Sequence, residues 1–335
     1  MKNAVLEINN KKESLDGLKE RNLEFLKKML QIRAFEENVL KLYHKGRLLG
    51  VSPHLSIGQE AMAVGTCAAL RREDYIITTH RGHGHCIAKG AKLRPMMAEL
   101  CGKESGYCKG RGGTMHIADV SLGILGANGI VGGGLPMACG VGLSIKYRNA
   151  NQVCVVFFGD GASNQGTFHE SVNFACAFKL PLIFICENNL YAISVLYEKV
   201  AATPNVADRA KGYDMPGVII DGNDIEEVYS TVCDAVKRVR KGEGPILIEG
   251  KTYRHLGHGA SDHRPYRTRD EENRWKSEND PINRLKEAMI ASGQLDESCY
   301  EKIKETALAD ADDALEYADS SPKPDPKDAL KYIYV

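Results

Sequence analysis

Two stretches of sequence decide the fold: Val153-Cys-Val-Val-Phe-Phe158, which runs into Gly159-Asp-Gly161, and Leu182-Ile-Phe-Ile-Cys186, which runs into Glu187-Asn-Asn189. Both runs are apolar and strand-length, as expected for strands buried on both faces of a parallel sheet. The 26 residues 162–187 between Gly161 and Asn188 have about the length of one crossover helix and its turns. Such a connection keeps the strands parallel, so both polar motifs meet at the same edge of the sheet.

The neighbouring segments continue this alternation of strands and helices. Further strands are predicted at Tyr75–Thr78, Gly217–Ile220 and Pro245–Glu249, and helices near 165–178, 206–212 and 224–240. This pattern predicts an α/β fold with a doubly wound, mainly parallel sheet, whose ligands bind at the carboxyl ends of the strands.

Helical extensions are predicted at both ends of the chain. Apolar residues recur at helical spacing over residues 15–45, and the C-terminal third is predicted to be helical from Asp280. Pro322, Pro324 and Pro326 end that helix before a final apolar tail. We therefore divide the chain into an N-terminal helical extension (1–50), an α/β domain (51–275) and a C-terminal helical extension (276–335).

Two more helices and an ordered loop are predicted inside the α/β domain. One helix begins near Ser56, whose hydroxyl can cap it, and the other begins at Pro136, a residue favoured in a first turn. Residues 102–134 contain eleven glycines interspersed with apolar side chains. We interpret this segment as an ordered loop that lets the backbone approach a ligand.

Composition narrows the class of protein. Of the 335 residues, 43% are hydrophobic and 26% are charged, which is typical of globular proteins. Forty-four Lys and Arg balance 44 Asp and Glu, so no net charge favours nucleic acid or membrane as a partner. No apolar run approaches the ~20 residues of a spanning helix, and the N-terminus lacks the apolar core of a signal peptide. The ten cysteines show no metal-binding pattern. We expect a reduced, cytoplasmic protein, with Cys154, Cys176 and Cys186 as buried free thiols.

The two strand-end motifs predict a metal site. Asp160 offers a carboxylate and Asn189 an amide oxygen, which suit a hard cation such as Mg²⁺ that also binds phosphate oxygens and water. The adjacent glycines let the backbone approach a diphosphate, and the following helix presents free N–H groups to it. Gly-Asp-Gly alone is a common turn, and Asn-Asn alone a common loop. Together, fewer than thirty residues apart, they are the signature of thiamine diphosphate binding.

With these motifs the chain resembles a family, the alpha subunits of the dehydrogenase component of pyruvate, branched-chain 2-oxo acid and acetoin dehydrogenase complexes. The resemblance extends from about residue 25 to the end. The stretches that carry it are His54-Leu-Ser-Ile-Gly-Gln-Glu-Ala61, His80-Arg-Gly-His-Gly84, Gly110-Arg-Gly-Gly-Thr-Met-His116, Gly126-Ala-Asn-Gly-Ile-Val-Gly132 and Tyr253-Arg-His-Leu-Gly-His258.

The resemblance implies roles for individual residues. Asp160, Asn189 and the backbone carbonyl of Tyr191 match the protein ligands of magnesium. Arg81 and His258 match residues that contact the diphosphate, and we also take His258 as the candidate catalytic residue. The remaining positions that match the cofactor lining are His54, His80, Gly129, Val131, Gly161 and Ala162. Position 80 is Tyr in many pyruvate and branched-chain relatives, so how His80 meets the cofactor is left open.

Segment Lys251–Asp270 resembles an active-site loop that orders around the cofactor. Gly257 and Gly259 permit movement, so we expect this loop to be mobile or displaced in the free chain. Gly259 also stands where mammalian pyruvate relatives carry a regulatory phosphorylated Ser. Other histidines are interpreted mainly as structural (His83, His85 and His116), while the roles of His255 and His263 are left open.

The resemblance also implies partners. A beta subunit supplies the pyrimidine domain and its Glu, the two chains form an α2β2 assembly, and a lipoyl acyltransferase receives the product. Residues 79–90 and 125–131 most resemble acetoin dehydrogenase alpha subunits, which implies acetoin as the small carbonyl substrate. Pyruvate is the next candidate, and a branched-chain 2-oxo acid is less favoured. Magnesium and thiamine diphosphate are the implied cofactors.

Two functions of other classes fit these residues less well. An NAD-binding dehydrogenase of the Rossmann type would need Gly-x-Gly-x-x-Gly after a strand, which the glycines after Phe158 do not match. A non-catalytic partner that only regulates a beta subunit would have no need of Asp160, Asn189, Arg81 and His258.

Overall fold

A parallel sheet forms the centre of the computed structural model, which describes residues 14–50 and 52–331. In this part of the chain the sheet has six strands in the order β2-β1-β3-β4-β8-β7. Their bounds are β1 Tyr75–Thr79, β2 Ile124–Asn128, β3 Cys154–Gly159, β4 Leu182–Asn188, β7 Gly217–Asp221 and β8 Ile246–Lys251. A separate small antiparallel hairpin pairs β5 (Tyr191–Ala192) with β6 (Val195–Leu196). The parallel alignment of β3 with β4 brings Gly159 opposite Glu187, as the two sequence motifs predicted.

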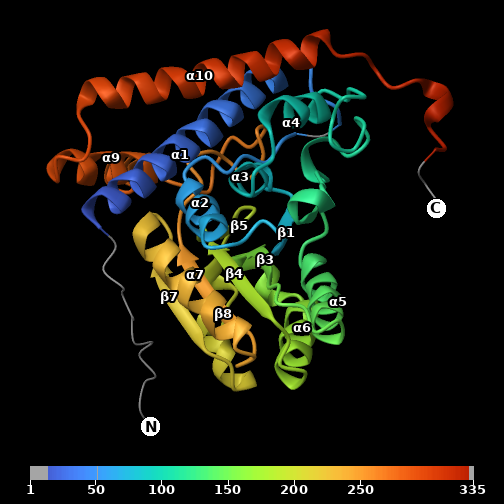
Figure 1. The fold of residues 1–335 in the computed structure, drawn as a ribbon, viewed down its shortest axis with the longest axis vertical. Coiled ribbons are helices and arrows are strands. Elements are labelled where there is room, and N and C mark those ends of the chain that lie inside the picture. The colour runs from blue at the N-terminus through green and yellow to red at the C-terminus, as the bar shows by residue number, and fades with distance from the viewer. Residues whose placement is uncertain (1–13, 51, 332–335) are drawn as a thin grey trace.

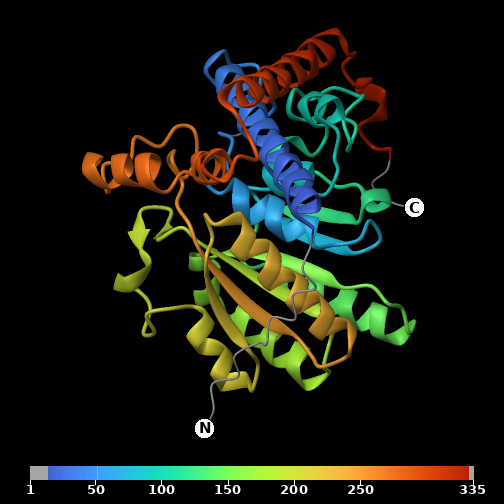
Figure 2. The same ribbon diagram turned by 60° about the vertical axis from the view of Figure 1, so that its left-hand side comes forward.

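Helices cover both faces of the sheet (Figures 1 and 2). Alternate residues of β3 point to opposite faces: Val155 and Phe157 join one hydrophobic cluster, and Val156 and Phe158 join the other. Helices α5 (Gly134–Tyr147) and α6 (Gly166–Ala177) pack in the second cluster. The first cluster takes side chains of the helices α1 (Leu15–His44), α2 (Glu60–Ala68), α3 (His83–Ala88), α4 (Leu93–Leu100), α7 (Ile225–Arg240), α9 (Pro281–Ala291) and α10 (Glu297–Ser320).

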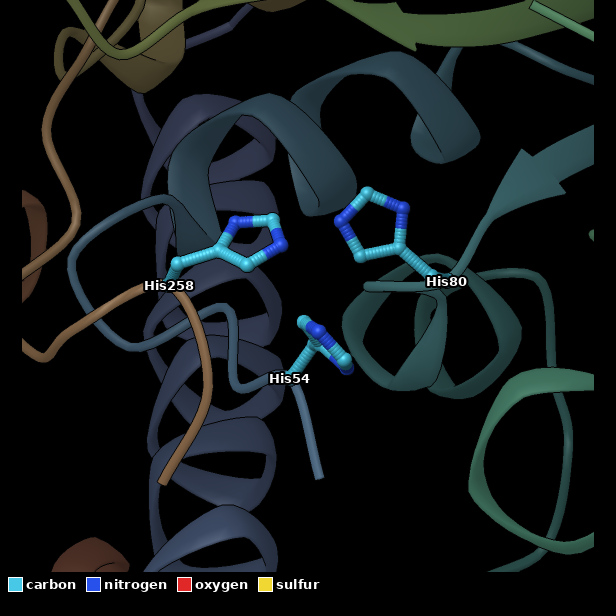
Figure 3. Close-up of side chains that lie close together, drawn as sticks. All are labelled: His54, His80 and His258. Carbon is cyan, nitrogen blue, oxygen red and sulfur yellow. The ribbon is translucent and has the colours of Figure 1, made fainter. Parts of the chain in front are cut away.

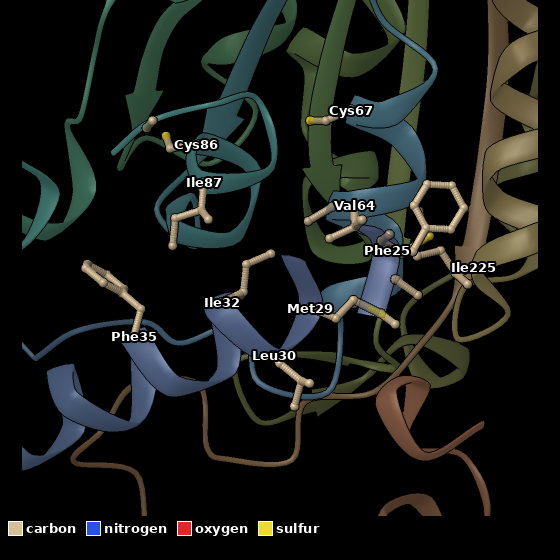
Figure 4. Packing of buried hydrophobic residues seen from close by; sticks show 14 of the residues in the cluster. Phe25, Met29, Leu30, Ile32, Phe35, Val64, Cys67, Cys86, Ile87 and Ile225 are labelled. Atoms are coloured by element: carbon tan, nitrogen blue, oxygen red, sulfur yellow. The ribbon is translucent and has the colours of Figure 1, made fainter. Parts of the chain in front are cut away.

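The terminal helices lie on one side of this arrangement. In Figures 1 and 2 the red α10 runs alongside the blue α1, and α9 also contacts α1. The short α8 (Arg269–Glu278) precedes α9 in the chain. Figure 4 shows α1 contributing Phe25, Met29, Ile32 and Phe35 to the core beneath it. Arg33 of α1 pairs with Glu60 and Asp280, which ties the N-terminal helix to α2 and to the N-cap of α9. Both terminal helices therefore share one core with the sheet.

Most predicted elements are confirmed. The doubly wound parallel sheet, the long helix over 15–45, the helix near Pro136 and the end of the last long helix before Pro322 are all present. The division at residues 50/51 and 275/276 stays a prediction. The N-terminal residues 1–13 and the last four residues of the predicted apolar tail lie outside the described residues.

The prediction that a helix begins near Ser56, with Ser56 as its cap, is wrong. Helix α2 begins four residues later, at Glu60, with Gln59 as its N-cap residue. Both the N–H and the hydroxyl of Ser56 donate to the buried carboxylate of Glu36, so they are not available to cap a helix. Gly58, at φ +99°, then turns the backbone before α2 starts. The helix predicted near 206–212 is a 3₁₀ helix, η5 (Ala207–Tyr213).

The glycine-rich segment contains an element that the sequence did not predict. Strand β2 lies inside it and forms one edge of the sheet, where it pairs with β1. Its register shifts between Ile76 and Ile77, and Gly126 sits at φ +147°. A five-residue edge strand that contains a glycine carries too weak a periodic signal to be recognised. The short helices α3 and α4 and the start of α8 at Arg269, inside the predicted loop, were likewise missed.

The cysteines and the helix lengths agree with the composition. All ten cysteines are free, and Cys154 and Cys186 are buried as expected, whereas Cys176 is only half-buried. Within residues 14–50 and 52–331, no helix is both long enough and apolar enough to cross a lipid bilayer.

Candidate functional site

Five strands of the sheet deliver polar or glycine-rich segments to one cavity at their carboxyl ends. The cavity has a volume of about 280 Å³. Its lining includes His80 and Arg81 after β1, Ile130 and Val131 after β2, Asp160 after β3, Asn189 after β4, and Arg254 and His258 after β8. Because all these strands are parallel, their ends collect at one edge of the sheet, where ligands of doubly wound folds bind.

Asp160 and Asn189 each keep one buried oxygen without a hydrogen-bond partner. Asp160 is 2% exposed and Asn189 is 7% exposed. The unpartnered atoms are Oδ2 of Asp160 and Oδ1 of Asn189. A buried polar atom without a partner costs free energy, on the order of 1–3 kcal/mol. Two such oxygens at adjacent strand ends indicate that something outside the chain satisfies them.

Gln59 orients the side chain of Asn189. The Nδ2 atom of Asn189 donates to Oε1 of Gln59 over 3.0 Å, which leaves Oδ1 as the free end of the amide. The preceding Asn188 is used differently: its Nδ2 donates to Glu249 and its Oδ1 accepts from the backbone N–H of Leu190. Only the second asparagine of the pair therefore has an oxygen available for a ligand.

The surroundings of Asp160 suit a bound cation. Burial raises the pKa of Asp160 to about 6, while Arg254 and the backbone N–H groups of Asp160 and Asn189 pull the pKa the other way. A cation next to the carboxylate would favour its ionised form. Gly161 follows in the short helix η3 (Asp160–Asn164), where an added Cβ would lie 2.7 Å from the Cβ of Ala192. The loop after β3 can thus approach hairpin β5–β6 only because residue 161 is glycine.

The donor set fits Mg²⁺ with a diphosphate. One carboxylate oxygen and one amide oxygen are hard ligands, and Mg²⁺ commonly completes its shell with phosphate oxygens and water. The unpartnered oxygens of Asp160 and Asn189 are the observation that supports this fit. Tyr191 lies in β5, directly after Asn189, and also lines the cavity.

Three histidines converge at one end of the cavity (Figure 3). The ring centroids of His54 lie 4.8 Å from His80 and 4.7 Å from His258, and those of His80 and His258 are 5.3 Å apart. In each ring one nitrogen lies within 4.8 Å of the others. Burial, reinforced by the positive charge of Arg81, lowers the pKa of His54 to about 4, of His80 to about 2 and of His258 to about 3. All three rings are neutral at physiological pH.

Two buried guanidinium groups stand beside these histidines. Arg81 donates to the carbonyl oxygens of Leu55 and His258. Arg254 contacts Nδ1 of His258 and donates to the carbonyl of Ile193. Burial and the charge of Arg254 lower the pKa of Arg81 to about 9, although neighbouring carboxylates oppose the shift. Within residues 14–50 and 52–331 neither guanidinium forms an ion pair with a carboxylate, so this end of the cavity is positively charged and suited to an anion.

Residues 251–270 lie against the cavity in this structure, so they are not displaced from it. The mobility that we expect for them in the free chain stays a prediction. The backbone N–H of His258 donates to Asp262 Oδ2 over 2.8 Å, and its carbonyl accepts from Arg81 over 3.0 Å. Arg267 donates to the carbonyls of Arg254 and Leu256. These bonds hold the backbone of His258 and of the residues just before it.

A carboxylate of α8 joins this segment to hairpin β5–β6. Glu271 accepts from the hydroxyl of Tyr191 over 3.0 Å and from that of Tyr253 over 2.8 Å. The guanidinium of Arg267 lies over the rings of both tyrosines, at 5.4 and 4.9 Å. The segment that carries His258 and the hairpin that carries Tyr191 are therefore held in one arrangement.

Comparison with known proteins identifies the family. The family model described as "Dehydrogenase E1 component" matches residues 27–327. The chain belongs to this family. It is 46% identical over 325 residues to the alpha subunit of acetoin:2,6-dichlorophenolindophenol oxidoreductase from Bacillus subtilis (strain 168), covering 97% of each chain. The subunit of the same name from Cupriavidus necator is 41% identical, covering 95% of each chain. The pyruvate dehydrogenase E1 component subunit alpha from Zymomonas mobilis is 40% identical, covering 95% of this chain and 89% of the relative.

The E1 family membership settles the broad class. The chain is an oxidoreductase subunit, the alpha subunit of an E1 dehydrogenase of the acetoin or pyruvate type. This family generally uses thiamine diphosphate and Mg²⁺. An alpha subunit implies a beta subunit within a multienzyme complex. The nucleotide-binding and purely regulatory alternatives are thereby set aside.

Most of the site residues predicted for this E1 subunit lie together. Those that line the main cavity are His80, Arg81, Val131, Asp160, Gly161, Ala162, Asn189, Tyr191 and His258. His54 instead lines an adjoining groove with His258, Gly259 and Asp262. Gly129 is outside both linings and packs near His116.

Three residues of the E1 site were missed from the sequence. Arg254 and Glu187 line the cavity, and Gln59 orients Asn189. Each stands inside a motif that was recognised, in Tyr253-Arg-His-Leu-Gly-His258, in Glu187-Asn-Asn189 and in His54–Ala61. The signal was therefore present, but which member of each motif points to the ligand depends on contacts across the fold.

The buried contacts of His83 and His85 agree with the structural interpretation of these two residues. His83 is buried between Glu36 and Thr114, and His85 hydrogen-bonds to Thr78 and Glu187 and stacks on Phe157. His116 is exposed and contacts the carbonyl of Gly112. His255 is buried with Nδ1 3.6 Å from Asp280, and His263 is exposed.

Proposed function

We propose that this chain binds thiamine diphosphate through a magnesium ion held by Asp160, Asn189 and the backbone carbonyl of Tyr191. The observation that carries the proposal is the pair of buried, unpartnered oxygens on Asp160 and Asn189. The positively charged end of the cavity supports the placement of the diphosphate beside Arg81 and His258. A fixed guanidinium suits phosphate oxygens, and a neutral imidazole N–H can donate to them.

Each residue has a defined task in this proposal. Gly161 and Ala162 let the backbone after β3 come close to the diphosphate, with Val131, His54 and His80 around the rest of the cofactor. The bound cofactor supplies an electron sink for the carbanion left when a carbon–carbon bond next to a carbonyl breaks. The chain's own part is to bind and orient the diphosphate, to exclude water through residues 251–270 and to donate from His258.

We infer that the cavity is completed by the beta subunit in an α2β2 assembly. Its volume of about 280 Å³ is slightly smaller than the ~300–1,000 Å³ of typical ligand sites. Three apolar side chains that line the cavity are also exposed: Ile130 at 74%, Val131 at 52% and Ile193 at 61%. Exposed apolar groups around a small cavity are suited to a partner that covers them. A lipoyl acyltransferase then takes up the product.

Acetoin is the substrate that we propose, with cleavage yielding a two-carbon unit for transfer to the lipoyl group. Two relatives at 46% and 41% identity carry acetoin in their names, and one at 40% is a pyruvate dehydrogenase subunit, so pyruvate is the second candidate. Turnover of the reconstituted alpha–beta pair with acetoin, pyruvate and 3-methyl-2-oxobutanoate tests the choice. Faster turnover of either 2-oxo acid than of acetoin would overturn it.

The metal site is tested by Asp160→Ala. We expect calorimetry to show loss of Mg²⁺-dependent thiamine diphosphate binding with an unchanged circular dichroism spectrum, because a carboxylate in a strand-end loop contributes little to the core. Asp221→Ala is the matched control, since Asp221 ends β7 of the same sheet but does not line the cavity. Unchanged cofactor affinity in Asp160→Ala would refute the assignment.

A further inference from the structure

The contact between Arg254 and His258 determines which nitrogen of the imidazole carries a hydrogen. Nη1 of Arg254 lies 3.0 Å from Nδ1 of His258. A guanidinium has only donors and stays protonated in proteins, so Nδ1 must accept and cannot carry a hydrogen. Since the ring is neutral, its single hydrogen is on Nε2.

The rest of the structure keeps both partners in this orientation. Arg254 is 1% exposed, and its Nη2 donates to the carbonyl of Ile193 over 3.0 Å. The backbone of His258 is held by Asp262 on its N–H and by Arg81 on its carbonyl. Figure 3 shows the far edge of the His258 ring turned toward His80. Nε2–H is therefore the group that His258 presents to the cluster.

We propose that Arg254 is a positioning residue that fixes His258 as its Nε2–H tautomer, so that the histidine cluster offers a hydrogen-bond donor to an anionic oxygen. This inference rests on the proposed function in taking that anion to be a diphosphate. Arg254 acts through the imidazole: its hydrogen bond occupies Nδ1 of His258, so the ring's hydrogen must be on Nε2. A charge-assisted bond from Nε2–H to a phosphate oxygen is stronger than a bond between neutral groups.

The contact between Arg254 and His258 also argues against a Zn²⁺ ion, the other ligand that a cluster of three histidines suggests. Three imidazole nitrogens within 4.8 Å of one another resemble the ligand set of a Zn²⁺ site with an open position. A metal would need a lone pair on the nitrogen that faces the cluster, but in His258 the lone pair is on Nδ1 and is taken by Arg254. The positive charges of Arg81 and Arg254 beside the cluster further disfavour a cation.

The tautomer is measured directly by ¹⁵N NMR of the full-length chain labelled at histidine, without cofactor. Resonances lost in His258→Gln assign the ring. We expect a protonated Nε2 and an unprotonated Nδ1 for His258 at pH 7.5. In Arg254→Met the preference should be lost, with both tautomers populated, whereas Arg254→Lys, which keeps a donor and a charge, should restore the single form. Circular dichroism of each variant verifies folding.

Three results would overturn the inference: an Nδ1–H or doubly protonated His258 in the unsubstituted chain, an unaltered tautomer in Arg254→Met, or Zn²⁺ binding that His80→Asn abolishes. The first and third use the unsubstituted chain or a substitution away from Arg254, so they decide the matter even where Arg254→Met fails to fold. Because no cofactor is present, the outcome is independent of the Asp160→Ala test. If Asp160→Ala loses cofactor binding but His258 of the unsubstituted chain shows both tautomers, the metal site is supported and only the role of Arg254 is refuted.

Discussion

The side-chain amide of Asn189 donates to Oε1 of Gln59 over 3.0 Å, and this single bond determines which end of the Asn189 amide is left free at the end of β4. Gln59 is the N-cap residue of α2 and is 1% exposed. An asparagine can rotate to present either its oxygen or its nitrogen. By accepting from Nδ2, Gln59 leaves Oδ1 for the proposed magnesium ion, a role of the kind that hydrogen-bond partners of metal ligands commonly fill.

Gln59→Leu is therefore expected to weaken Mg²⁺ binding. Removing the partner of a metal ligand typically costs about 10–100-fold in affinity, and we expect a loss in this range in calorimetric titrations of Mg²⁺ at saturating thiamine diphosphate. Gln59→Glu keeps an acceptor for Nδ2 and serves as the matched control. Equal Mg²⁺ affinity in Gln59→Leu and the unsubstituted chain would show that Asn189 needs no such support.

The histidine cluster predicts how stability depends on pH. His54, His80 and His258 have pKa values of about 4, 2 and 3 in the folded chain, against an ordinary value of about 6.5. Between the folded and unfolded values the unfolded chain binds more protons, so stability rises with pH in that window. The stabilisation is complete above pH ~6.5 and is lost progressively as the pH falls toward 4. Burial is the main cause of the lowered pKa of all three rings, the charges of Arg81 and Arg254 reinforce it, and Asp262 opposes it at His258.

Urea denaturation of the cofactor-free chain between pH 7.5 and 4.5 measures this slope. His80→Asn removes the ring with the lowest pKa and should make the free energy of unfolding less dependent on pH by up to one proton. His263→Asn removes an exposed histidine and is the control. A slope that His80→Asn leaves unchanged would mean that the ring is not kept neutral in the native chain.

Residues 251–270 should become more protected when the cofactor binds. His258→Ala removes a donor to the diphosphate, which is worth ~1.5–3 kcal/mol for a charged hydrogen bond, or about 10–100-fold in affinity. We expect cofactor affinity and turnover to fall together in this variant and much less in His263→Ala, whose side chain is exposed. Limited proteolysis checks the segment itself: equal cleavage rates within 251–270 with and without cofactor would contradict its ordering.

The exposed apolar residues at the cavity predict the position of the partner subunit. Ile130→Asp places a charge where we expect the beta subunit to pack, and it should weaken assembly in analytical ultracentrifugation while the isolated chain stays folded. Leu308→Asp on α10 is a control, because Leu308 is also an exposed apolar residue but lies outside the cavity. The isolated alpha chain should be inactive. Turnover of acetoin by the alpha chain alone at the rate of the complex would refute a shared site.

The parallel sheet and the meeting of Asp160 and Asn189 at one edge of it could be predicted from the sequence alone. The runs Val153–Phe158 and Leu182–Cys186 are apolar and short, a pattern that local periodicity reports directly, and the crossover rule then places Asp160 and Asn189 at one edge. The long helix α1 was equally plain, since its buried residues recur at helical spacing. These features depend on residues close together in the sequence, or on the rule that a strand–helix–strand connection joins parallel strands.

The tertiary structure decided what depends on contacts between distant segments. Ser56 donates hydrogen bonds to Glu36 and does not cap a helix, because α1, which carries Glu36, packs beside it. Strand β2 forms because it can pair with β1. Gln59 meets Asn189 across 130 positions of sequence, so no local pattern could show which atom of that amide is free. Arg254 and His258 are only four residues apart, but the bond between them requires a fold that buries the guanidinium beside the imidazole. Sequence thus determined which groups reach the sheet edge, and packing determined which way each of them points.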